Sequence, residues 1–243
     1  MTFILTSDVD FVSDDFLDIA YRPLKELPLT IFMTGRSEYL DKAVCENTWW
    51  ETEPHPNFCD QSTHGNSISE VFSTIEQFYG DAVGFRCHKY YSSNDIEEEF
   101  ANRGFSYASN ICTDLVSIAP FWDRCGILQI PIFFEDGGYL KYHGVPRLDD
   151  ILKRMHRDAV YVFNFHPIHL VLNSCDFSTI RRLKDSMSAT RYSMLSAEDA
   201  RMLRNNAYGV ADFLGELISY ANKNNIEFLN LKQYYGKQKA NRI

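Results

Sequence analysis

Two carboxylates stand directly behind a short apolar run near the beginning of the sequence. Phe3–Leu5 leads to Asp8 and Asp10 in the stretch MTFILTSDVDF. Side chains at positions i and i+2 of a β-strand share a face, so a strand that reached Asp10 would hold both carboxylates together. Two like charges at that distance repel unless a proton or a cation lies between them. The pair is either an Asp-rich surface turn or half of a metal site.

Polar side chains also follow other strand-like segments. They are Asp8 and Asp10, His55 and His64, Arg86 and His88, Glu135 and Asp136, and His166 and His169. In α/β barrels the carboxyl ends of the parallel strands gather functional groups on one face. We interpret this recurrence as one site rather than as separate surface turns.

These residue types suit a catalytic divalent ion. Carboxylate and imidazole are ligands that zinc prefers, and two histidines with one aspartate leave positions open for water and a carbonyl oxygen. A further aspartate near the ion could take a proton from that water. A histidine across the site could donate one to a leaving group.

The elements that would position these groups alternate between strand and helix patterns. The segment Ile68–Phe78 is a clear amphipathic helix with Ser67 as a cap, and a long helix is expected over Ala197–Asn222. The expected strands are Phe3–Ser7, Leu29–Thr34, Thr48–Glu53, Ala82–Phe85, Phe105–Ser109, Ile127–Phe134, Val160–Phe165 and a last one in IEFLNL. Such alternation predicts an α/β fold with a parallel sheet. The absence of a Gly-x-Gly-x-x-Gly turn favours a barrel over a nucleotide-binding open sheet.

Composition limits the classes of partner. The chain of 243 residues has no repeat or linker pattern, which predicts one domain over residues 1–243. A net charge of −9 argues against nucleic acid as a partner. Six scattered cysteines without a C-x-x-C pair are typical of reduced thiols. With neither a signal peptide nor an apolar run long enough for a transmembrane segment, we expect a cytoplasmic protein.

The motifs resemble the polysaccharide deacetylase (NodB-homology) family of carbohydrate esterases. The matching segments, in chain order, are Thr6–Asp10, Leu29–Gly35, Glu51–His55, Arg86 in GFRCH, Asp136, and His166 in FNFHP. The segments HPNF, HG, GFRCH and FHP resemble a divergent branch associated with O-antigen and capsule biosynthesis. The resemblance implies a distorted, seven-stranded (β/α) barrel and a metal-dependent deacetylase, with Zn²⁺ as the expected ion.

The resemblance also implies roles for individual residues. Asp8 becomes the general base, Arg86 orients it, and His166 becomes the acid with Asp136 as its partner. The metal ligands become Asp10, His55 and a second histidine. The family's spacing of four residues falls on Cys59 in this chain, so His64, nine residues after His55, is the preferred ligand, while Glu51 and Asp60 remain alternatives.

Two functions follow from these readings. The first is hydrolysis of an N-acetyl group on a sugar of a surface-polysaccharide precursor, with a small-molecule or lipid- or nucleotide-linked sugar as substrate. The second is an inactive barrel that binds a sugar or a partner enzyme, which the unusual spacing of His55 and His64 favours.

Overall fold

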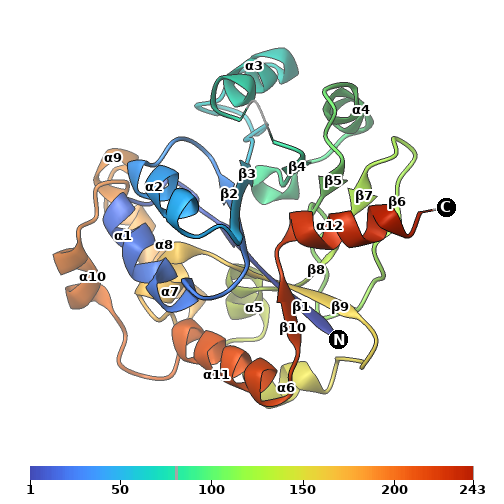
Figure 1. Ribbon diagram of the computed structural model, residues 1–243. Helices are drawn as coiled ribbons and strands as arrows, with labels where there is room; N and C mark the ends of the chain where they lie inside the picture. Colours follow the sequence, from blue (N-terminus) through green and yellow to red (C-terminus); the bar gives the residue numbers. More distant parts are fainter. Residues whose placement is uncertain (80–81, 243) are drawn as a thin grey trace.

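The fold is built on a parallel sheet with β1 at its centre (Figure 1). The computed structural model describes residues 1–79 and 82–242. Strand β1 pairs on one side with β9, and on the other with β10 over Thr2–Ile4 and with β2 over Leu5–Asp8. The strands are β1 (Thr2–Asp8), β2 (Leu29–Met33), β3 (Trp50–Pro54), β4 (Gly84–Phe85), β5 (Tyr107–Ala108), β6 (Phe121–Trp122), β7 (Leu128–Gln129), β8 (Ile132–Glu135), β9 (Val160–Phe165) and β10 (Glu227–Leu229).

A second, smaller sheet continues the ring of strands. Its order is β4-β5-β7-β6, and only β6 runs antiparallel to its neighbour. The amide of Arg86 donates to the Pro54 carbonyl at 3.2 Å, which ties the chain after β4 to the end of β3. On the other side, a parallel bridge joins Cys112 to Ile132 of β8. These links complete the distorted α/β barrel expected from the sequence.

Helices cover the outside of the strands (Figure 1). Serine caps start several of them: Ser13, Ser37, Ser67 and Ser93 each accept a hydrogen bond from the amide three residues further on. The helices are α1 (Asp14–Tyr21), α2 (Glu38–Glu46), α3 (Ile68–Phe78), α4 (Asn94–Asn102), α5 (Asp136–Tyr142), α6 (Leu148–Leu152), α7 (Pro167–Val171), α8 (Phe177–Asp185), α9 (Ala189–Tyr192), α10 (Ala197–Leu203), α11 (Val210–Lys223) and α12 (Leu231–Ala240), with 3₁₀ turns at Arg22–Leu24 and His88–Tyr90. Within the described ranges, no helix combines the length and the apolar character needed to cross a bilayer.

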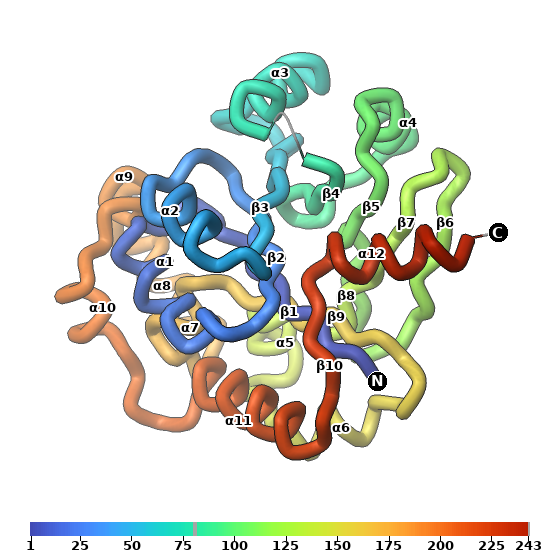
Figure 2. Tube along the Cα trace, viewed as in Figure 1, coloured from blue at the N-terminus to red at the C-terminus, as the bar shows by residue number. Residues whose placement is uncertain are grey.

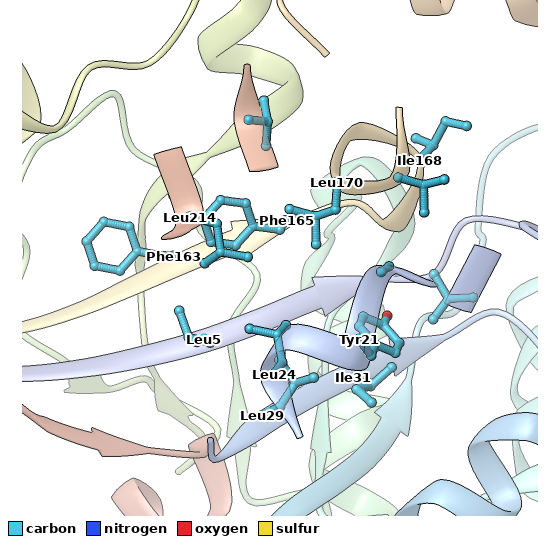
Figure 3. Packing of buried hydrophobic residues seen from close by; sticks show 14 of the residues in the cluster. Leu5, Tyr21, Leu24, Leu29, Ile31, Phe163, Phe165, Ile168, Leu170 and Leu214 are labelled. Carbon is cyan, nitrogen blue, oxygen red and sulfur yellow. The ribbon is translucent and has the colours of Figure 1, made fainter. Parts of the chain in front are cut away.

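The largest hydrophobic cluster lies between the outer face of the main sheet and helices α1, α7 and α11 (Figure 3). Alternate residues of β1 divide between two clusters, because Leu5 joins this outer one whereas Ile4 points into the barrel. Residues of the outer cluster include Leu5, Tyr21, Leu24, Leu29, Ile31, Phe163, Phe165, Ile168, Leu170 and Leu214. This packing holds β1, β2 and β9 in place, and their carboxyl ends carry much of the candidate site.

Two buried glutamates of β3 attach the C-terminal helix and the second sheet to the barrel. Glu51 Oε1 accepts hydrogen bonds from the Thr30 hydroxyl (2.6 Å) and from the Lys232 amide (3.0 Å) at the start of α12. Glu53 Oε1 accepts one from the Tyr107 hydroxyl (2.8 Å). Figure 2 shows α12, in red, crossing beside β6 and β7, where the Tyr235 ring lies 6.1 Å from that of Trp122.

Two elements differ from the expectation because of single residues. The expected strand Ile127–Phe134 is divided into β7 and β8 around Pro131, which has no amide hydrogen for the ladder. The expected helix Ala197–Asn222 is two helices, α10 and α11, separated by a turn that ends at Gly209. A Cβ atom on Gly209 would lie 2.2 Å from the Asn173 carbonyl oxygen, so a glycine is needed at this break.

The Glu53 carboxyl gives the fold a measurable pH dependence. Burial, together with the neighbouring Glu51, raises the pKa of Glu53 to about 8. Because this folded-state pKa lies above the unfolded value of about 4.5, the carboxyl stabilises the fold at low pH, and that contribution is lost as the pH rises towards 8. We expect Glu53→Gln, which resembles the protonated form, to lose less stability than the wild type between pH 5 and pH 8. Parallel slopes of unfolding free energy against pH for the two proteins would contradict this.

Candidate active site

A buried ion pair between Asp8 and Arg86 lies at the carboxyl ends of the strands. Arg86 Nη1 donates to Asp8 Oδ1 at 2.8 Å, and neither side chain is more than 3% exposed. The guanidinium also donates to the Ser109 carbonyl (2.6 Å) through Nε and to the Ser109 hydroxyl (2.8 Å) through Nη2, and its carbon lies 4.2 Å from the centre of the Phe32 ring. The hydrogen bonds to Ser109 and the contact with Phe32 fix the position of the Arg86 guanidinium, which in turn orients the Asp8 carboxylate.

Asn164 of β9 completes this network. Its Nδ2 donates to Asp8 Oδ2 at 2.9 Å, and its Oδ1 accepts hydrogen bonds from Arg86 Nη1 (2.5 Å) and the Thr6 hydroxyl (2.8 Å). The contact follows from the parallel register, which places Thr6 of β1 opposite Asn164. Both oxygens of Asp8 therefore accept a hydrogen bond, and each retains a second lone pair.

The surroundings keep the Asp8 carboxylate ionised. Burial acts to raise the pKa of Asp8, but the Arg86 guanidinium and the imidazoles of His55 and His166 outweigh it and bring the pKa below its usual value. An ionised, buried and oriented carboxylate is suited to accept a proton from water.

Asp10 faces two imidazoles rather than sharing a strand face with Asp8. Strand β1 ends at Asp8, and Asp10 and Phe11 follow in left-handed conformations, with φ of 48° and 64°. Asp10 Oδ1 lies 3.0 Å from His88 Nδ1 and 3.5 Å from His55 Nε2. The three side chains form a group with the distances of a metal site.

The details of this group fit a bound cation. Asp10 Oδ1 is buried and accepts no hydrogen bond from any residue that the structure describes. His55 Nδ1 lies 2.7 Å from the Arg86 carbonyl, so its hydrogen is directed there and the lone pair of Nε2 is left facing Asp10. One carboxylate and two imidazoles are a donor set that zinc accepts.

His64, the ligand preferred from the sequence, lies outside this group. Its Nδ1 accepts a hydrogen bond from the Asn57 amide (3.1 Å), and its Nε2 lies 2.6 Å from the Thr34 carbonyl. Both ring nitrogens are thus used within the fold, and burial lowers the pKa of the ring. His64 connects the loop that carries His55 to the end of β2. In the group with Asp10 and His55, His88 stands where His64 was expected. The alternatives do not take it either: Glu51 is bonded within the barrel, and Asp60 lines a separate cavity beside Phe58.

His166 faces the same centre from β9. Its Nδ1 lies 2.6 Å from Asp136 Oδ1, its backbone amide donates to Asp136 Oδ2 at 2.8 Å, and its Nε2 lies 3.8 Å from Asp10 Oδ2. Burial acts to lower the pKa of His166, but the carboxylates of Asp136, Glu135 and Asp10 raise it to about 10. The pairing with Asp136 expected from the sequence is present, and it leaves a protonated Nε2 directed at the centre.

His169 belongs to the support of this pair. It lies close to Asp136 and His166, but both Asp136 oxygens already accept hydrogen bonds from His166, so we do not assign a second metal site there. His169 Nδ1 lies 3.0 Å from the Ser174 hydroxyl. Burial lowers the pKa of His169 to about 4, which makes it a neutral packing partner of His166.

Sequence reasoning missed the role of Asn164 and left that of His88 open. The signal for Asn164 was a polar residue inside the apolar strand VYVFNF, two positions before His166 and therefore on the same face. Glu135 was noted only as a strand-end carboxylate. It accepts hydrogen bonds from the amides of Gly137 (2.8 Å) and Gly138 (2.6 Å) and so caps α5 beside the centre.

A buried carboxylate–arginine pair, an Asp–His–His group and an Asp–His pair thus lie together on one rim of the barrel. Residues 5–184 match the family model WbmS-like polysaccharide deacetylase, and the chain belongs to that family. A crystal structure from Bordetella bronchiseptica, described as a candidate polysaccharide deacetylase involved in O-antigen biosynthesis, is 24% identical, covers 90% of each chain and superposes with a TM-score of 0.77. A candidate polysaccharide deacetylase from Mycobacterium smegmatis is 13% identical over 95% of this chain and 93% of its own, with a TM-score of 0.43. A search of curated proteins gives no match.

The Asp8–Arg86 pair predicts strong coupling in stability. We expect Arg86→Met to lower the free energy of unfolding by about 3–5 kcal/mol, because it leaves a buried carboxylate without its partner. The double variant Asp8→Asn, Arg86→Met should cost clearly less than the sum of the two single changes, as measured by chemical denaturation. Arg191→Met, at an exposed ion pair, serves as the control and should change little. Additive effects at Asp8 and Arg86 would contradict the coupling.

Proposed function

We propose that this protein is a metal-dependent deacetylase that hydrolyses an N-acetyl group on a sugar of a surface-polysaccharide precursor. The observation that carries the proposal is the convergence of an ionised Asp8, the Asp10–His55–His88 group and a protonated His166 on one centre. The three parts correspond to a base, a metal site and an acid. Membership of a polysaccharide deacetylase family supports this reading.

Asp10, His55 and His88 would hold the ion, with zinc as our first candidate. A bound divalent cation at this position supplies Lewis acidity towards the amide carbonyl and towards water. The second contact of His55, to the Arg86 carbonyl, fixes the ring so that Nε2 is the ligand atom. Arg86 therefore orients both the proposed base, Asp8, through its side chain and the proposed ligand His55 through its backbone carbonyl.

Asp8 acts as the general base. Arg86 and Asn164 fix the plane of its carboxylate, so the free lone pairs keep one direction and the proton of the attacking water is received without reorganisation. A new bond forms between the water oxygen and the carbonyl carbon.

His166 acts as the general acid. Asp136 binds Nδ1 and the backbone amide, which keeps the ring oriented with Nε2–H towards the centre. As the carbon–nitrogen bond breaks, Nε2 gives its proton to the leaving nitrogen, and the products are acetate and an amino sugar. The Asp136 carboxylate stabilises the positive charge of His166 before transfer.

The O-antigen context rests on the family and on the Bordetella relative. That relative is described as involved in O-antigen biosynthesis, and we extend the same context to this chain as part of the proposal. The inactive-barrel alternative drew its support from the spacing of His55 and His64. The proximity of His88 to Asp10 and His55 supports the active-enzyme proposal over that alternative.

Metal binding tests the ligand set. We expect the wild type to bind one zinc ion, and His55→Ala and His88→Ala to lose it, in metal analysis and calorimetric titration. His64→Ala should be less stable yet still bind the ion, and His143→Ala, at an exposed side chain, should match the wild type. Loss of metal in His64→Ala with retention in His88→Ala would show that our ligand set is wrong. No zinc binding by the wild type would overturn the metal site itself.

Acetate release tests the roles of base and acid. For N-acetylhexosamine substrates, we expect Asp8→Asn and His166→Gln to lower kcat by about 10²–10⁴-fold while the metal content is unchanged. His156→Gln, at an exposed histidine, provides the matched histidine control. Full activity in either variant would remove that residue from the mechanism.

A further inference from the structure

We infer that a cavity beside Glu135 binds the sugar ring that carries the amide, and that it selects an uncharged or amino sugar over one bearing phosphate or carboxylate. We call it the tyrosine cavity; its walls include Tyr90, Asp114, Glu135, Tyr139 and Tyr142. This inference rests on the proposed function, since it names the substrate class of that site. The volume of about 490 Å³ lies within the range of small-molecule sites.

The tyrosine cavity adjoins the catalytic centre through two of its walls. Glu135 directly precedes Asp136, and its Oε1 lies 3.3 Å from His166 Nδ1. Tyr90 follows His88 by two residues on the same 3₁₀ turn, with φ of 56°. The cavity therefore borders His166 through Glu135, and it borders the turn that carries His88 through Tyr90.

The direction of the reaction assigns the tyrosine cavity to the leaving group. The nitrogen that receives the proton from His166 remains attached to the sugar ring. We therefore place that ring on the His166 side of the centre, and the tyrosine cavity is the one whose wall includes Glu135, the neighbour of His166. Another cavity, of about 420 Å³, is lined by residues that include Phe11, Thr34 and Arg36.

The walls have the chemistry of a sugar site. Tyr139 and Tyr142 of α5 offer aromatic faces for the apolar side of a ring, and carboxylate oxygens offer acceptors for hydroxyl groups. Glu135 is held rigidly by the amides of Gly137 and Gly138, and each of its oxygens keeps a free lone pair. Asp114 uses Oδ1 for His143, at 2.7 Å, and keeps Oδ2 for a ligand.

The charges of the walls exclude anionic sugars. The lining carries the carboxylates of Asp114 and Glu135, and it includes no lysine or arginine side chain. The nearby cation Lys141 lies over the Tyr142 ring, 4.8 Å from its centre. A phosphate or a uronate in the tyrosine cavity would meet the like charges of Asp114 and Glu135. The diphosphate of a nucleotide- or lipid-linked sugar would have to lie outside it.

The test measures binding to the protein as purified, by ligand-observed NMR. The probes are N-acetylglucosamine, N-acetylgalactosamine and N-acetylglucosamine 6-phosphate. We expect the wild type to bind at least one neutral sugar and to bind the phosphorylated sugar at least about tenfold more weakly. Tyr142→Ala should weaken neutral-sugar binding by about three- to tenfold, whereas Tyr220→Ala on α11 should not. Asp114→Lys should reduce the discrimination against the phosphorylated sugar.

Failure of this inference is distinguishable from failure of the proposed function. Hydrolysis of a sugar-free acyl probe, p-nitrophenyl acetate, by the wild type and its loss in Asp8→Asn test the catalytic centre without a sugar. Absence of binding by both neutral sugars, or binding that Tyr142→Ala and Asp114→Lys leave unchanged, would overturn the tyrosine cavity even if hydrolysis occurs. Sugar binding that follows the expected pattern, without hydrolysis of any probe, would support the cavity and overturn the enzyme.

Discussion

The buried guanidinium of Arg86 is the constraint on which the candidate site depends. A cation fully inside a protein is tolerated only when opposite charge and hydrogen-bond acceptors surround it, and here Asp8, Thr6, Ser109 and Asn164 supply them. These partners come from β1, from the segment after β5, and from β9. Satisfying one arginine therefore brings together strands that are far apart in the sequence.

The same residue connects Asp8 to the Asp10–His55–His88 group. Its side chain orients Asp8, while its carbonyl accepts the hydrogen from His55 Nδ1 and leaves Nε2 to face Asp10. His166 is supported separately, because Asp136 and not Arg86 orients it. The geometry thus keeps an ionised carboxylate and a protonated imidazole within one small site. Their opposite protonation states follow from different partners: a guanidinium beside Asp8 and carboxylates around His166.

Local patterns predicted the strands and the strand-end residues, but not the path of the loops between them. The order of Asp8, His55, Arg86, Asp136 and His166 behind apolar strands was enough to expect one site. The choice between His64 and His88 depends on how the loop after β3 folds back, and there the Asn57 amide and the Thr34 carbonyl occupy the ring of His64. The left-handed conformation of Asp10 could not be predicted from the sequence either, because an aspartate indicates a positive φ less strongly than a glycine does. The role of Asn164, by contrast, could have been predicted, because a polar residue inside the apolar strand VYVFNF stands two positions before His166.

The pairing of β1 with β9 has a consequence for the order of events during synthesis. A ribosome completes Asp8 and Arg86 long before Asn164 and His166, because the chain is made from its N-terminus. Until β9 has emerged, the nascent chain holds the first half of the site without the strand that satisfies it. The slow, long-range closure of the ring then completes the ion network and brings His166 to the Asp10–His55–His88 group. His166 thus joins that group last, so an incomplete chain lacks this part of the candidate site.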